Sequence, residues 1–189
     1  MISPTLLGCW ASVSGSRTLQ GVVRAIDPER GALIEFAGGR MPPQWVDSAK
    51  LDVLPNTHVG GCCIFVYRGL PGSGKSTAAK QLAAAIGGLH IESDDYLCNE
   101  DGVYEWTQER RDAAIARVQN EAREALTSGK PLVLAQVFPT HASMQWVREL
   151  ASELRAPLFI ATLRGSYGSI HNVPDDAMAS MAARFEAIP

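Results

Sequence analysis

Apolar runs and helical patterns alternate along the chain from residue 62 onward. The apolar runs that we predict as strands are residues 62–68, 89–92, 132–135 and 157–163. The segments with helical spacing of apolar positions are residues 75–86, 108–128, 142–154 and 174–187. Strands that alternate with helices form a parallel sheet with helices on both faces. We therefore predict an α/β domain, a three-layer sandwich around a parallel sheet, over residues 61–189.

Residues 1–60 have a different pattern, in which short apolar runs stand between turn residues without a helical period. The predicted strands are residues 6–13, 19–26, 32–36 and 51–54 and the region around Trp45. This pattern resembles a small all-β barrel of the SH3-like or Tudor-like kind, and the turn-forming segment 55–61 predicts its boundary.

Two tryptophans of this N-terminal region have two interpretations. Trp10 and Trp45 could offer flat faces on which nucleic-acid bases stack. Burial in the core of the barrel is favoured instead, because aromatic side chains contribute mainly through packing.

The strand at residues 62–68 leads directly into the motif Gly-x-x-x-x-Gly-Lys-Ser, and a helix follows at once, as a phosphate-binding loop (P-loop) requires. The backbone N–H groups of such a loop and the helix N-terminus together hold a polyphosphate. Lys75 can reach the terminal phosphates, and the Ser76 hydroxyl is placed to ligate Mg²⁺. An ordinary glycine turn before a helix would not need the complete motif. The predicted nucleotide-binding residues are Gly69, Pro71, Gly72, Ser73, Gly74, Lys75, Ser76, Thr77 and, from the last helix, Arg184.

Two carboxylates follow the second predicted strand of the α/β domain, at an edge where α/β sheets bind ligands. Asp94 is a candidate general base for an acceptor hydroxyl. It could instead cap a helical turn or pair with Arg68. Asp95 is a candidate for ordering Mg²⁺ together with Ser76.

The third and fourth strands end at Gln136 and Arg164. Many P-loop enzymes have an acidic Mg²⁺ ligand near the first of these positions, whereas this chain has a neutral amide. Arg164 is a candidate catalytic residue that would offset charge during phosphoryl transfer; a surface ion pair is the alternative. Arg184 and His171 could also point toward the nucleotide, although a lone loop histidine is more often solvated.

The charge and the hydrophobic content of the chain limit the partners that it can bind. The 189 residues carry a formal net charge of −3, and 46% of them are hydrophobic. Any contact with nucleic acid should therefore be local, because general affinity for nucleic acid requires many basic groups. No apolar run is long enough to cross a bilayer and no signal peptide is recognisable, so we expect a cytoplasmic protein with no membrane partner. The four cysteines lack the spacing of zinc ligands.

The motifs together resemble the polynucleotide-kinase-like branch of P-loop kinases, which includes phage polynucleotide 5′-kinases and Nedd4-binding-protein-2-like proteins. The matching stretches are residues 68–77, 93–96, 101–106, 170–174 and 181–186. The resemblance implies a P-loop NTPase fold, ATP and Mg²⁺ as cofactors, Asp94 as the general base, and residues 164–174 as a lid.

The chain also departs from the pattern of this family. The usual Asp-Thr-Asn after the third strand is replaced by residues 136–138, Gln-Val-Phe. The arginine that usually follows the aspartate pair is absent near Leu97 and Cys98, and the usual lid arginine is Gly168 or Ser169. Because the acceptor-binding parts change while the ATP-binding parts remain, we predict a different acceptor.

We therefore predict an ATP-dependent kinase that acts on a hydroxyl in nucleic acid, with Lys75, Asp94 and Arg164 as catalytic residues. The acceptor would be a 5′-OH end or the hydroxymethyl group of a modified DNA base such as 5-hydroxymethyluracil, as in phage enzymes that act in the host cytoplasm. The N-terminal barrel would help to hold the strand. One alternative is a small-molecule kinase for a nucleoside or sugar, which the slightly acidic balance favours. The other is a non-enzymatic, nucleotide-dependent binding module, which the missing acid favours.

Overall fold

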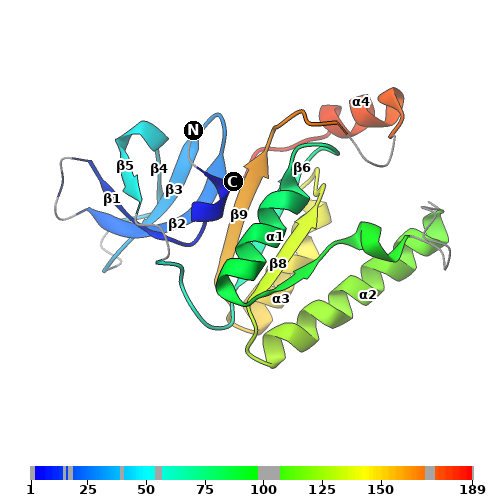
Figure 1. The fold of residues 1–189 in the computed structure, drawn as a ribbon, viewed down its shortest axis with the longest axis horizontal. Coiled ribbons are helices and arrows are strands. Elements are labelled where there is room, and N and C mark those ends of the chain that lie inside the picture. Colours follow the sequence, from blue (N-terminus) through cyan, green and yellow to red (C-terminus); the bar gives the residue numbers. More distant parts are fainter. Residues whose placement is uncertain are drawn as a thin grey trace.

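A mostly parallel sheet forms the centre of the molecule. The computed structural model describes residues 3–14, 16, 19–38, 41–53, 57–97, 107–168 and 173–188. Five parallel strands lie in the order β2, β9, β6, β8, β7, with the bounds Gln20–Asp27, Leu158–Leu163, Ile64–Gly69, Leu132–Gln136 and Leu89–Ile91 (Figure 1). Because they are parallel, all five end at the same edge of the sheet, where α/β proteins bind their ligands.

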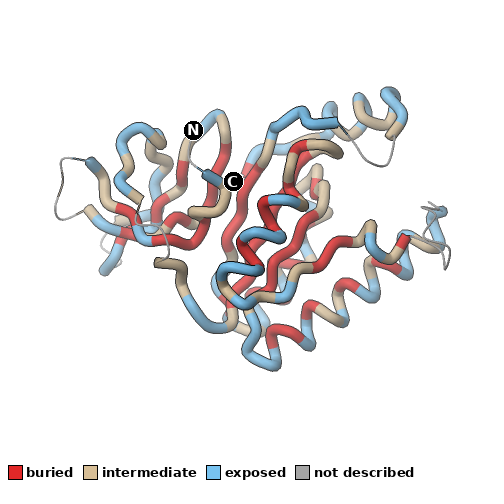
Figure 2. Tube along the Cα trace, in the orientation of Figure 1, coloured by how far each residue is buried: buried red, intermediate tan, exposed pale blue. Residues whose placement is uncertain are grey.

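Helices cover both faces of this sheet. They are α1 (Lys75–Ile86), α2 (Gln108–Thr127) and α3 (Gln145–Glu153), whereas α4 (Asp175–Ala183) has no buried residue and lies beyond the carboxyl edge of the sheet (Figure 1). Helix α1 packs into one hydrophobic core through Leu82, whereas α2 and α3 pack into a second core through Val118 and Val147. The strands between the two cores are buried along most of their length (Figure 2). The predicted α/β fold with a parallel sheet is therefore confirmed. None of the described helices is long and apolar enough to span a bilayer.

The N-terminal strands pair in an antiparallel arrangement. Strands β1 (Trp10–Val13), β3 (Gly31–Phe36), β4 (Gln44–Val46) and β5 (Leu51–Val53) join β2 in the order β4, β3, β2, β1, β5. Between the described residues of β4 and β5 there is no pairing that would close a barrel. The SH3-like barrel therefore stays a prediction.

The two tryptophans of this region differ. The Trp10 side chain is 40% exposed, so the burial expected for it is wrong. Trp45 is half-buried, and the Arg30 guanidinium lies 4.0 Å from the centre of its ring.

Strand β2 connects the N-terminal strands to the parallel sheet. A bulge lies between Val23 and Ala25, where the register with β3 shifts. Before the bulge β2 pairs with β1; after it, Ala25 and Ile26 pair in parallel with Ile160 and Ala161 of β9. Residues on both sides of the predicted boundary at residue 60 share one hydrophobic core. The carboxyl end of β2 consequently lies at the ligand-binding edge.

Arg68, at the end of β6, holds the C-terminal tail. Its side chain is almost completely buried and donates hydrogen bonds to the carbonyl oxygens of Pro139 (3.3 Å) and Glu186 (2.9 Å). The guanidinium also lies 4.2 Å from the centre of the Phe185 ring. Burial lowers the pKa of Arg68 to about 10, although nearby carboxylates oppose this shift.

The helix bounds differ from prediction at two places. The predicted helix 142–154 begins with a 3₁₀ turn, η4 (Ala142–Met144), before α3 starts. The predicted helix 174–187 ends at Ala183, because the backbone of Glu186 bonds to the β8–α3 connection and to Arg68 instead of continuing the helix.

Candidate active site

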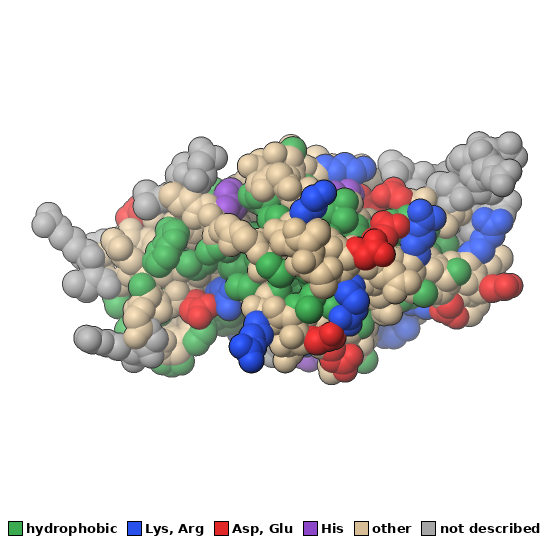
Figure 3. Space-filling model, turned by 90° about the horizontal axis from the view of Figure 1, so that it is seen from below, with side chains coloured by type: hydrophobic (Ala, Val, Ile, Leu, Met, Phe, Trp, Pro, Cys, Tyr) green, Lys and Arg blue, Asp and Glu red, His purple; other side chains and the backbone are tan. Residues whose placement is uncertain are grey.

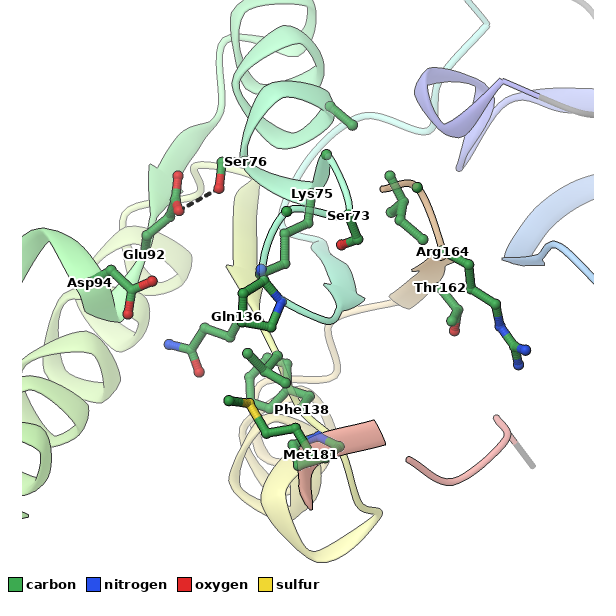
Figure 4. A pocket seen from close by; sticks show the side chains of 18 of the residues that line it. Ser73, Lys75, Ser76, Glu92, Asp94, Gln136, Phe138, Thr162, Arg164 and Met181 are labelled. Atoms are coloured by element: carbon green, nitrogen blue, oxygen red, sulfur yellow. Dashed lines mark hydrogen bonds between the residues drawn. The ribbon is translucent and has the colours of Figure 1, made fainter. Parts of the chain in front are cut away.

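The P-loop connects β6 to α1 and borders a cleft of about 2030 Å³ at the carboxyl edge of the sheet (Figure 4). Gly72 and Gly74 have φ angles of 74° and 88°, which residues with a Cβ rarely adopt. A Cβ on Gly69 would collide with the Ser73 hydroxyl and the Leu163 carbonyl. The backbone angles of Gly72 and Gly74 and the lack of space at Gly69 explain why the loop needs glycines at these positions. The predicted nucleotide-binding residues that line the cleft are Pro71, Gly72, Ser73, Gly74, Lys75, Ser76, Thr77 and Arg184.

Lys75 places a buried positive charge at the base of this cleft. Its side chain lies at the start of α1, is largely buried, and donates to the Leu70 carbonyl at 3.3 Å. Burial lowers the pKa of the Lys75 ammonium, while the negative charges of Asp94 and Glu92 act against that shift. The P-loop lysine therefore lies within the electrostatic reach of two carboxylates.

Glu92 is a site residue that the sequence analysis missed. The residue is 7% exposed, and its carboxylate accepts a hydrogen bond of 2.6 Å from the Ser76 hydroxyl (Figure 4). The His90 Nε2 atom lies 3.0 Å from the other carboxylate oxygen, and the Lys80 ammonium lies 3.7 Å away. Burial acts to raise the pKa of Glu92, but the contacts from His90 and Ser76 outweigh it and the pKa is lowered. The sequence signal available was the position of Glu92 directly after a strand, two residues before Asp94.

The predicted carboxylates Asp94 and Asp95 lie in the 3₁₀ turn η3 (Ser93–Tyr96), and both line the cleft. Asp94 is half-buried beside Glu92, and its charge acts on Lys75 (Figure 4). Asp95 is exposed. The structure therefore brings Asp94 close to the P-loop, whereas the carboxylate bonded to Ser76 belongs to Glu92 and not to Asp95.

Oxygen donors at this place suit Mg²⁺, which prefers one or two carboxylates and otherwise keeps water and phosphate oxygens as ligands. The hydroxyl of Ser76 and the carboxylate of Glu92 are such donors and already lie in contact. In the described part of the chain, no group of three or more His, Cys, Asp or Glu side chains is arranged to hold a metal. The donor set therefore fits a cation that is shared with a nucleotide.

The end of β8 carries an amide and a strained residue. The Gln136 side chain lines the cleft, and its Nε2 atom has no hydrogen-bond partner among the described residues. Phe138 has a φ angle of 42°, a conformation that costs energy in residues other than glycine and that recurs at functional sites. Its ring packs against Trp146 with 6.3 Å between ring centres. The two aromatic rings thus form an apolar side of the cleft.

Arg164 lies on the side of the P-loop opposite Asp94 (Figure 4). Its guanidinium pairs with the carboxylate of Glu29, in the turn that follows β2, and points away from Lys75 (Figure 4). This is the ion pair that the sequence left as an alternative. A role of Arg164 in phosphoryl transfer would require this pair to open, and it stays a prediction.

Other predicted residues are less informative. Arg184 is exposed at the end of α4, where its Nε atom donates to the Ser180 carbonyl at 3.1 Å. The motif at residues 101–106, Cys98, Ser169 and His171 lie outside the described residues.

Comparison with known proteins agrees with this geometry. A crystal structure of a sugar kinase from Janibacter sp. HTCC2649 superposes with a TM-score of 0.50 at 20% sequence identity, over 67% of this chain and 79% of the other. A gluconokinase from Sinorhizobium meliloti 1021 gives a TM-score of 0.50 at 22% identity, over 68% of this chain and 78% of the other. At such identities the likeness shows a common fold and not a common substrate.

A chain of the Pnkp1/Rnl/Hen1 RNA repair complex superposes with a TM-score of 0.55 at 15% identity, over 70% of this chain. The match covers 46% of that larger chain, so this protein spans about half its length. The model of the AAA domain family AAA_33 matches residues 64–166, which is more than half of the sequence and includes the P-loop, Glu92 and Asp94. The chain therefore belongs to this AAA domain family and has the fold of a P-loop kinase.

Proposed function

We propose that this protein transfers the γ-phosphate of Mg²⁺-bound ATP to a hydroxyl group in nucleic acid. The observation that carries this proposal is the convergence of Lys75, Asp94 and the Ser76–Glu92 pair at one end of the cleft. A cation, a candidate base and a pair of oxygen donors are the groups that phosphoryl transfer uses.

Each residue has a definite task in this proposal. The backbone of residues 69–76 and the Lys75 ammonium bind and orient the phosphates. Asp94 accepts the proton of the acceptor hydroxyl. The oxygen of that hydroxyl bonds to the γ-phosphorus, while the bond from the γ-phosphorus to the β–γ bridging oxygen breaks and ADP leaves. Ser76 and Glu92 would hold Mg²⁺, which neutralises charge on the phosphate oxygens. These roles derive from the P-loop motif and from the placement of the side chains around it.

The size and lining of the cleft are compatible with a nucleotide donor and an acceptor bound together. Its volume of about 2030 Å³, which includes the P-loop, exceeds the roughly 300–1,000 Å³ of a pocket for one ligand. Trp146 is half-buried, packs against the buried Phe138, and gives the cleft an apolar surface against which a base could pack. The acceptor would be a 5′-OH end or the hydroxymethyl group of a modified base such as 5-hydroxymethyluracil, and a base acceptor would have to leave its helix to reach Asp94.

A small-molecule kinase for a nucleoside or sugar is the second candidate, and the distribution of charge favours it. On the face shown in Figure 3, Lys and Arg side chains are mixed with Asp and Glu side chains. Several arginines are paired with carboxylates, among them Arg24 with Glu35 and Arg123 with Glu153. Paired arginines contribute little to binding a phosphate backbone.

Labelled ATP separates these candidates. The protein is incubated with Mg²⁺, ATP labelled at the γ-phosphate, and single-stranded DNA that carries either a 5′-OH end or 5-hydroxymethyluracil. Label in the DNA supports the proposal, and label in a nucleoside or sugar supports the second candidate. Lys75→Ala should abolish transfer in both cases. If the protein binds ATP but transfers label to neither class of acceptor, the result supports the third hypothesis, a non-enzymatic, nucleotide-dependent binding module.

A further inference from the structure

The flank of the cleft that lies opposite Asp94 is built partly from the N-terminal region. Residues of 1–60 that line it include Ser3, Pro4, Thr5, Asp27, Pro28 and Ser48. The order of the parallel strands explains this placement, because β6 with the P-loop is central, β7 leads to Asp94 on one side, and β2 ends on the other.

This flank is fixed to the kinase part of the chain by specific contacts. The Tyr67 hydroxyl, on β6, donates to the Pro4 carbonyl at 2.8 Å. Within the N-terminal region, the ring of His58 hydrogen-bonds the Thr5 carbonyl at 2.8 Å and so holds residues 3–5 against the segment that leads to β6. The pair between Arg164 and Glu29 links the turn after β2 to the end of β9. The N-terminal residues are therefore held in a defined position beside the P-loop.

The chemistry of this flank suits an uncharged ligand. None of the described Lys or Arg side chains of residues 1–60 lines the cleft. The Asp27 carboxylate accepts hydrogen bonds from the backbone N–H groups of Glu29 and Arg30, so its charge stabilises its own turn. The other lining residues of this region are proline, serine, threonine, isoleucine and glycine, none of which can neutralise the phosphates of a nucleic-acid strand.

Two observations point to a ligand here. The Thr162 hydroxyl, on β9 at the same flank, is 3% exposed and has no hydrogen-bond partner in the described part of the chain. The Tyr167 side chain is 82% exposed, lines the cleft, and its ring lies against Gly74 of the P-loop. An exposed aromatic face of this kind can stack on a nucleobase.

We propose that the N-terminal residues 3–5, 28 and 48 bind the ribose and base of the donor nucleotide, so that the segments between and before the N-terminal strands belong to the donor site. This inference rests on the proposed function, which places the γ-phosphate beside Asp94. The remainder of the donor then extends across the P-loop to the opposite flank. The earlier expectation that the N-terminal strands hold a nucleic-acid acceptor is replaced by this assignment.

Comparison of two polyphosphates tests the assignment. Isothermal titration measures the affinity for ATP and for inorganic tripolyphosphate, both with Mg²⁺, and the wild-type protein should bind ATP more tightly. Ser48→Trp, which adds bulk to the nucleoside end, should weaken ATP binding about tenfold or more and leave tripolyphosphate binding unchanged. Ser48 lies in the 3₁₀ turn η2 (Ser48–Lys50). The matched control is Ala49→Trp, because Ala49 is exposed in the same turn and does not line the cleft.

Crosslinking of the wild-type protein with 8-azido-ATP provides a readout that does not depend on folding of the variant. Label within residues 3–5, 28 or 48 supports the assignment, and label found only outside residues 1–60 overturns it. Equal affinity for ATP and tripolyphosphate also overturns it, as does a Ser48→Trp variant with unchanged ATP affinity, and either result leaves the kinase proposal intact. Failure of the wild-type protein to bind either polyphosphate would overturn the proposed function itself.

Discussion

The Ser76 hydroxyl donates a hydrogen bond of 2.6 Å to the Glu92 carboxylate, and this contact joins the P-loop to the end of β7. Ser76 comes from the motif that the sequence identifies, whereas Glu92 follows a short strand of only three residues. The His90 Nε2 atom lies 3.0 Å from the other oxygen of the Glu92 carboxylate. A buried acid in this position can take the place of the acid that is missing at Gln136.

Glu92→Gln should therefore weaken cation binding. We expect the affinity of the protein–ATP complex for Mn²⁺, measured by electron paramagnetic resonance, to fall by about 10–100-fold. Asp95→Asn is the matched control, because Asp95 is exposed in the neighbouring turn and does not contact Ser76. If Asp95→Asn weakens Mn²⁺ binding and Glu92→Gln does not, the original prediction of Asp95 as the metal residue is correct.

Asp94→Asn should slow transfer without removing the donor site. Its amide cannot accept the proton of the acceptor hydroxyl, so we expect turnover to fall by roughly 10²–10⁴-fold. The affinity for ATP should stay within a few-fold of wild type, because the P-loop remains intact. Single-turnover kinetics with labelled ATP measures both quantities. Unchanged turnover in this variant would show that Asp94 is not the base.

The local parts of the site were predictable, whereas the contacts between distant segments were not. Gly72, Gly74 and Lys75 belong to a continuous motif whose backbone requirements can be recognised from spacing alone. Glu92 acquires its role only because β7 lies beside β8, which brings its end close to α1. Sequence spacing contains no information on that distance.

The same distinction applies to the fold. Most predicted strands and helices agree with the observed elements because apolar periodicity reflects local burial. The predicted strand 6–13 is shorter than expected, because a 3₁₀ turn, η1 (Pro4–Leu6), precedes it and β1 begins only at Trp10. The parallel pairing of Ala25 with Ile160 links segments 135 residues apart, and no local pattern indicates it. Trp10 was predicted to be buried from its residue type, but its place near the start of β1 leaves it exposed.

Arg68→Ala should destabilise the protein strongly. Removal of this buried guanidinium takes away the Arg68 hydrogen bond to the Glu186 carbonyl and one of the two hydrogen bonds to the Pro139 carbonyl, and it opens a cavity under Phe185. We expect the free energy of unfolding, measured in urea, to fall by about 2–5 kcal/mol. Arg123→Ala removes an exposed pair with Glu153 and should leave the free energy of unfolding nearly unchanged, because water screens exposed ion pairs. Similar losses in the two variants would contradict the anchoring role of Arg68.

A chain that begins at residue 61 should not fold cooperatively by itself. Val23 and Ile34 of the N-terminal strands share a hydrophobic core with Phe65 and Phe159 of the central sheet, so truncation exposes an apolar face that is normally covered. It also leaves one edge of β9 without its partner strand. We expect the truncated chain to lose its cooperative thermal transition, followed by circular dichroism, and to bind the dye ANS.

Cleavage of the folded protein tests whether folding depends on the presence of the N-terminal strands or on their covalent connection to the rest of the chain. A protease site introduced at Gly60 and Gly61, which are exposed, allows the two fragments to be cut after folding. Because the fragments share a core, they should remain associated on gel filtration and unfold in one transition. A truncated chain that melts cooperatively at the temperature of the intact protein would instead establish residues 61–189 as an independent domain, as the sequence first suggested.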